Sequence, residues 1–161
     1  MLKYVDTLVS FQEVPDEISL CINISNCPCH CEGCHSPYLA EDIGELLTTF
    51  ELTKLIRKNK GITCVAFLGG DSNPKEVNAL AIWINNAFPE LKVAWYSGRQ
   101  EISSYINLEY FNYVKIGPYL KDKGSITNRN TNQKMYKVIP FMDFDGRWCT
   151  QLINITHKFW K

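Results

Sequence analysis

The sequence predicts an α/β fold with a mostly parallel sheet, arranged as an open or partial β/α barrel. Short apolar runs alternate with amphipathic helical segments, which is typical of parallel strands joined by helical crossovers. The 161 residues contain no linker, internal repeat or low-complexity tract, so we expect a single domain over 1–161. A closed barrel of eight strand–helix units takes about 250 residues, which this chain lacks.

Apolar runs of four to seven residues mark the expected strands. The second run is continuously apolar, as in a strand that is buried on both faces. Two later runs are expected to add one or two more strands, at Tyr136–Ile139 and Cys149–Ile153. The four principal strand segments are Ile18–Ile24, Thr63–Leu68, Leu91–Tyr96 and Tyr113–Ile116.

Three helices are expected between these strands. The first begins at Thr48, which forms a capping box with Glu51, and Gly61 is expected to end it. The second begins at Asn73, which is followed by a proline at the first helical position. A third, shorter helix is expected near Gln100–Ile106.

Composition and charge restrict the class of protein. Lys and Arg total 17 and Asp and Glu total 17, so the formal net charge is zero, which argues against an electrostatic nucleic-acid binder. No apolar run approaches the roughly 18 residues that a bilayer-spanning helix needs. The first residues lack the pattern of a secretory signal. We therefore expect a cytoplasmic protein without a nucleic-acid or membrane partner.

Seven cysteines are the most unusual feature of the composition. An odd number without a secretory signal argues against a disulfide framework. Cys21, Cys64 and Cys149 stand in apolar surroundings and are expected to be small buried hydrophobic residues. The other four lie within the eight residues 27–34, and packing alone gives no reason for four thiols in one loop.

Four unusual loops follow the four principal strands, and in parallel α/β sheets ligands gather at the carboxyl ends of the strands. The cysteine loop follows the first strand, and Gly69-Gly70-Asp71 follows the second. Ser97-Gly98-Arg99 follows the third, and Gly117-Pro118 follows the fourth. We expect all four loops to share one rim of the sheet.

The cysteine loop allows more than one metal site. Cys27, Cys31 and Cys34 give the spacing C-x3-C-x2-C, which can bind three corners of a [4Fe-4S] cluster and leave one iron without a protein ligand. A zinc site would need four ligands, and no second cysteine pair follows downstream. A redox pair of Cys31 and Cys34 would leave Cys27 without a role.

These residues resemble the radical S-adenosylmethionine (SAM) superfamily, and in particular the small activating enzymes of anaerobic ribonucleotide reductase. Three segments carry the resemblance: Glu32–Pro37 around the third cysteine, the turn Leu68–Asp71, and Asn130–Lys134. It extends over about Ser25–Lys137. The superfamily usually has an aromatic residue where this chain has a glycine before the third cysteine, but glycine is usual in the reductase activases. Cys29 is an extra thiol inside the motif.

The resemblance implies a fold, a reaction and partners. The fold would be the partial barrel of the radical SAM type, and Cys27, Cys31 and Cys34 would ligate the cluster. The amino and carboxylate groups of SAM would chelate the fourth iron. The reduced cluster would cleave SAM to methionine and a 5′-deoxyadenosyl radical, which would generate a glycyl radical on the large subunit of anaerobic ribonucleoside-triphosphate reductase. An electron donor such as flavodoxin would reduce the cluster.

The resemblance also implies which residues contact SAM. Gly69, Gly70 and Asp71 would hold its methionine end, and Ser97 and Arg99 would reach its nucleotide or carboxylate. The backbone beside the cluster would touch SAM at Gly33, Cys34 and His35. Two alternatives stay open: a zinc-binding protein-interaction module, and a radical SAM enzyme that acts on a small molecule.

Overall fold

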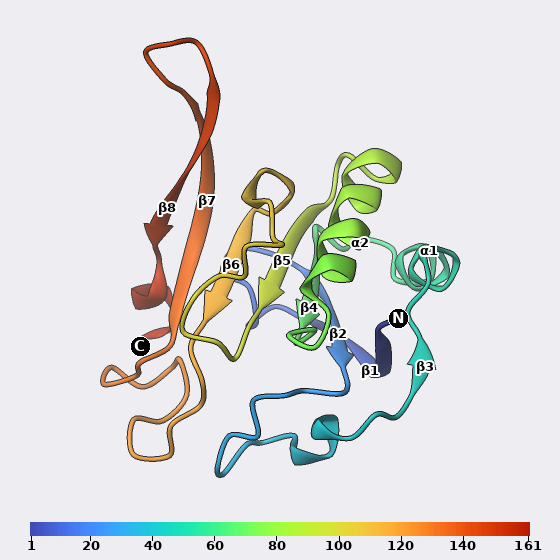
Figure 1. Cartoon of the computed structure of the whole chain (residues 1–161), viewed down its shortest axis with the longest axis vertical. Coiled ribbons are helices and arrows are strands. Elements are labelled where there is room, and N and C mark those ends of the chain that lie inside the picture. The colour runs from blue at the N-terminus through green and yellow to red at the C-terminus, as the bar shows by residue number, and fades with distance from the viewer.

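Four parallel strands form the centre of the sheet in the computed structural model, which describes residues 1–161 (Figure 1). They correspond to the four principal strands that the sequence predicts. In the second of them, Cys64–Phe67 are buried and Leu68 is half-buried, close to what is expected for a strand covered on both faces. In spatial order they are β2 (Ser19–Ile24), β4 (Cys64–Leu68), β5 (Lys92–Tyr96) and β6 (Tyr113–Ile116).

Two antiparallel strands flank this centre on each side. β1 (Lys3–Ser10) and β3 (Glu45–Leu46) extend one edge. β7 (Lys134–Met142) and β8 (Trp148–Asn154) extend the other as a long hairpin, which projects past the ends of the central strands in Figure 1. The complete order is β3-β1-β2-β4-β5-β6-β7-β8.

The predicted mostly parallel, partial β/α barrel of the radical SAM type is therefore wrong. The sheet is mixed, and the chain has two α-helices. A parallel connection needs a crossover of about a dozen residues or more. Residues 11–18 are too few to provide one between β1 and β2, and residues 143–147 are too few between β7 and β8, so both pairs are antiparallel.

The two α-helices begin where the sequence predicts. In α1 (Thr49–Lys58), the Glu51 backbone N–H donates to the Thr48 hydroxyl over 3.1 Å. In α2 (Pro74–Ala87), the side-chain oxygen of Asn73 caps the first turn in the same way. The first helix ends earlier than predicted, at Lys58, and not at Gly61.

The predicted helix at Gln100–Ile106 is absent. The segment forms bends, and the Ser103 hydroxyl accepts a hydrogen bond from the Tyr105 backbone N–H over 3.3 Å. Such a local side-chain bond competes with helical hydrogen bonding. The short 3-10 helices of the chain are η1 (Pro37–Ala40), η2 (Leu108–Tyr110) and η3 (Thr156–Phe159).

The two faces of the sheet are covered differently. Both α-helices pack on one face, where apolar residues of α1 and α2 join those of the central strands in one core. Val14, Ile126 and Ile155, from segments outside the helices, cover the other face. Cys21 and Cys64 are fully buried in this second core, as predicted.

The prediction is wrong for Cys149, which is half-buried on the hairpin with its Sγ 3.7 Å from an oxygen of Asp143. No helix combines the length and the apolar character that a bilayer crossing requires.

Candidate functional site

A cavity of about 530 Å³ lies at the carboxyl ends of the central parallel strands. Residues from the loops after β2, β4, β5 and β6 all line it, and Figure 1 shows these strands ending on the same side of the molecule. The prediction that four loops share one rim is confirmed. The lining includes all four loop cysteines: Cys27, Cys29, Cys31 and Cys34.

The cysteine loop is anchored at its start and turns sharply afterwards. The Cys27 backbone N–H donates to the Leu39 carbonyl over 2.8 Å. Asn26, His30 and Gly33 have left-handed backbone conformations, with φ of 58°, 44° and 75°. These turns fold the loop back over the cavity. All four thiols are free.

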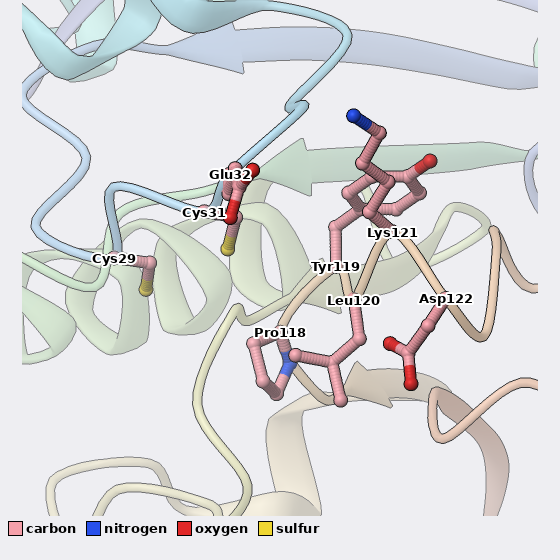
Figure 2. Close-up of a pocket in the computed structure, with 8 residues that line it drawn as sticks. All are labelled: Cys29, Cys31, Glu32, Pro118, Tyr119, Leu120, Lys121 and Asp122. Carbon is pink, nitrogen blue, oxygen red and sulfur yellow. The ribbon is translucent and has the colours of Figure 1, made fainter.

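The loop after β6 lies opposite the cysteine loop. Figure 2 shows Cys29 and Cys31 on one side of a second, open depression and Pro118–Asp122 on the other. The His35 ring meets the Tyr119 ring edge-on, with 5.4 Å between centroids. Tyr119, like Cys29 and Cys31, lines both depressions, so it stands between them. Sequence analysis did not indicate this position.

Asp71 is the most firmly held side chain of the rim. Its carboxylate accepts from the Ser97 hydroxyl over 2.6 Å and from the Gly98 backbone N–H over 2.8 Å. The Ser97 hydroxyl in turn accepts from the Arg99 backbone N–H over 3.0 Å. The loops after β4 and β5 are therefore joined at one carboxylate.

Cys29 packs into this junction. Its Sγ lies 3.7 Å from an oxygen of Asp71, and a Cβ at Gly98 would come within 2.7 Å of the same sulfur. A side chain at position 98 would therefore displace the Cys29 thiol. Burial, followed by the Asp71 carboxylate, raises the pKa of Cys29 to about 12.

Three residues that the resemblance assigns to SAM do not line the cavity: Gly33, Gly70 and Arg99. Gly70 is buried, and a Cβ there would lie 2.5 Å from a methyl group of Val77 in α2, so it faces the core. Arg99 is exposed and lines a neighbouring depression with Asp71 and Pro74. At Gly33, a Cβ would lie 3.5 Å from the Tyr119 ring, so this residue only flanks the cavity. The other five predicted contacts line it: Cys34, His35, Gly69, Asp71 and Ser97.

The floor of the cavity consists of strand residues. One row in register crosses the central strands and carries Asn23, Leu68, Tyr96 and Lys115, and all four line the cavity. Gln133, just before β7, adds a buried amide. Gln133 lies within the Asn130–Lys134 segment that carries the resemblance. Sequence reasoning missed Lys115, because the β6 segment, Tyr-Val-Lys-Ile, has no alternating pattern that would single out the lysine.

The donor set fits an iron–sulfur cluster. Cys27, Cys31 and Cys34 are free thiols of one loop that all face one cavity, and thiolates are the usual ligands of such clusters. In the rotamers of the structure, no three His, Cys, Asp or Glu side chains stand close enough to hold a metal ion. This does not conflict with a cluster, because each cysteine binds a different iron and the thiols need not converge on one ion.

A cysteine-lined cavity at the carboxyl ends of parallel strands defines an iron–sulfur protein. The chain belongs to the family described as 4Fe-4S single cluster domain, whose model matches residues 18–139. The match spans all four loops of the rim and the central strands, and it favours the cluster over the zinc site. Among curated proteins and among solved structures, nothing matches the chain.

Proposed function

We propose that this protein is an activase that cleaves SAM and generates a glycyl radical on anaerobic ribonucleotide reductase. The observation that carries the proposal is the single cavity in which the C-x3-C-x2-C thiols meet Gly69, Asp71 and the Ser97-Gly98 turn. The cysteine loop and the Gly69–Asp71 turn are two of the segments through which the sequence resembles the reductase activases, and the Ser97-Gly98 turn joins them from a third loop.

The proposed roles follow from where the side chains lie. Cys27, Cys31 and Cys34 would hold the cluster, and Cys29, directed at Asp71, would not be a ligand. When bound, the reduced cluster would supply the electron that cleaves SAM to methionine and a radical able to take hydrogen from a glycine Cα. Asp71, held rigidly by two donors, offers its remaining acceptor capacity to the ammonium of SAM.

The backbone also contributes. Gly69 has a φ of 106° and lines the cavity without a side chain, so a ligand can approach its peptide groups closely. Gly33, Cys34 and His35 would contact SAM beside the cluster. Tyr119 would shield the bound ligand from the surface, because it stands between the two depressions.

The proposed partners are the large subunit of anaerobic ribonucleoside-triphosphate reductase and an electron donor such as flavodoxin. Hydrogen transfer requires reacting atoms about 3–3.5 Å apart, so the target glycine must enter the cavity on an extended segment. Such a segment loses conformational entropy on docking, and we expect it to bind weakly by itself.

The cluster ligands are tested by cysteine variants reconstituted anaerobically with iron and sulfide. Ala at Cys27, Cys31 or Cys34 should each abolish the cluster, measured as iron and sulfide per chain and by visible absorption. The matched control, Cys29→Ala, should keep about four irons. Loss of iron in Cys29→Ala together with retention in one of the other three would contradict the ligand set.

The reaction is tested with the reduced holoprotein, SAM and the reductase. We expect 5′-deoxyadenosine and methionine, and a glycyl radical doublet by electron paramagnetic resonance that disappears when the target glycine of the reductase is replaced by Ala. SAM consumption without any protein radical would instead indicate a small-molecule substrate. A cluster that transfers electrons without cleaving SAM would refute SAM chemistry.

A further inference from the structure

One cation lines the main cavity, and it has no ionic partner. Of the residues around this cavity, Lys115 is the single lysine or arginine. Its ammonium forms no salt bridge or hydrogen bond within the chain, and it lies over the face of the Tyr96 ring, 4.8 Å from the ring centroid. Burial lowers the pKa of Lys115, and the Glu13 carboxylate acts in the opposite direction. Lys115 is half-buried, so its partly desolvated ammonium can gain from a ligand that supplies an anionic acceptor.

A second group on the floor also lacks a partner. Gln133 is 7% exposed, and its amide nitrogen donates to the Gly117 carbonyl over 3.3 Å. Its side-chain oxygen is buried and accepts no hydrogen bond. Buried polar atoms are normally paired, so this one is an independent indication that the floor is completed by a ligand.

The charges around the cavity match those of one SAM molecule. Two carboxylates line it, Glu13 and Asp71, together with the one ammonium of Lys115. SAM carries the complementary set: two cations, its sulfonium and its ammonium, and one carboxylate. Arg99, the other cation considered for the carboxylate, is exposed and lines a different depression.

We propose that Lys115 binds the carboxylate of SAM and that Gln133 accepts a hydrogen bond from the same ligand. This inference rests on the proposed function. A carboxylate has two oxygens, so coordination of iron through one leaves the other free to accept from Lys115. The floor then recognises the amino-acid end of SAM from within the sheet, while the loops contact SAM at the rim.

The test is calorimetric binding to the oxidised, cluster-loaded protein, in which SAM is not consumed. Two probes are compared: SAM and decarboxylated SAM, which lacks only the carboxylate. The variant Lys115→Met removes the charge and keeps the length of the side chain. Lys134→Met is the matched control, because Lys134 is an exposed neighbour on β7 that does not line this cavity. Arg99→Met tests the competing cation.

We expect Lys115→Met to weaken SAM binding by about 10- to 100-fold, the range for a lost hydrogen bond to a charged group. Its affinity for decarboxylated SAM should stay unchanged or increase slightly, because a positive charge facing a more cationic ligand has been removed. Lys134→Met should bind both probes like the wild type.

Two results would overturn the inference and leave the proposed function intact. One is equal loss of affinity for both probes in Lys115→Met, which would mean that the lysine only supports the floor. The other is carboxylate discrimination that disappears in Arg99→Met and persists in Lys115→Met. Failure of the wild-type holoprotein to bind SAM would refute the proposed function and this inference together.

Discussion

Two charged side chains, the buried Glu17 and the half-buried Lys115, lie at opposite ends of the central strands and have opposite surroundings. Glu17 lies at the amino ends, where its carboxylate accepts from Lys92 over 2.5 Å, from Thr63 over 2.7 Å and from Tyr113 over 2.7 Å. Lys115 lies near the carboxyl end of β6 and has no acceptor. The chain satisfies its own charge at one end of the sheet and leaves one for a ligand at the other.

This contrast shows which end of the sheet serves stability and which serves binding. The partners of Glu17 stand just before or at the start of β4, β5 and β6, so the carboxylate joins three strands at their amino ends. The opposite ends are joined through Asp71 at the rim of the cavity. We infer that stability and ligand binding can be changed separately.

The largest expected effect is on stability, from Glu17→Gln. The variant removes the charge that accepts three hydrogen bonds, each contributing about 1.5–3 kcal/mol, and one of its acceptors becomes an amide; we expect a loss of about 3–5 kcal/mol in the free energy of unfolding. Denaturant unfolding of the apoprotein measures it. Stability unchanged within about 0.5 kcal/mol would contradict the role of Glu17 in joining the strands.

The same carboxylate predicts a pH dependence. Burial opposes ionisation of Glu17, but the hydrogen bonds from Lys92, Thr63 and Tyr113 lower its pKa overall. A carboxyl with a lowered folded-state pKa contributes stability above its unfolded value, about 4.3, and loses it as the pH falls through the folded value. The difference in stability between wild type and Glu17→Gln should therefore shrink below about pH 4.

An intermediate loss of stability is expected from Gly70→Ala. This variant tests whether Gly70 packs against the core and not against the cavity. The new Cβ would lie 2.5 Å from Val77, in a backbone conformation with φ of 95°. Overpacking and backbone strain together should cost about 2–4 kcal/mol. Gly61→Ala is the control, because Gly61 has a φ of 87° with nothing within 4 Å, so it isolates the backbone strain. Equal losses in both variants would mean that α2 moves freely away from Gly70.

The smallest expected effect is from Lys115→Met on the stability of the ligand-free protein. Because burial lowers the folded-state pKa of Lys115, the unfolded chain binds more protons between that pKa and about 10.4, and wild-type stability rises with pH there. At pH 7, Lys115→Met should therefore be as stable as the wild type or slightly more stable. This difference in stability between the two proteins should fall toward pH 10. Thermal unfolding of both proteins across this range measures it. A clear destabilisation at pH 7 would show that Lys115 has a partner within the chain.

Local patterns predicted the parts of the molecule that depend on neighbours in sequence. The central strands follow apolar runs, and Thr48 and Asn73 cap helices three residues before the N–H groups they accept from. The cysteine spacing indicated the cluster that the family match supports. The antiparallel edges, by contrast, depend on loop lengths that strand patterns do not reveal.

The two contrasted charges could not be predicted in this way. Glu17 is 75 residues from Lys92 and 96 from Tyr113, so its environment exists only once the strands have paired. In a sequence, Lys115 looks like any single charge at a strand end. Its isolation becomes visible only when the surrounding cavity is built from four loops.

The register of the floor sets a length scale for the cavity. Asn23, Leu68, Tyr96 and Lys115 stand on four adjacent strands, each separated from the next by one hydrogen-bonded spacing of about 4.8 Å. Three such intervals give a row about 14 Å long, which the backbone fixes independently of the side chains. Substitutions in the loops can therefore change the chemical groups at the rim, while the length of this row, and with it the width of the cavity beneath the rim, stays constant.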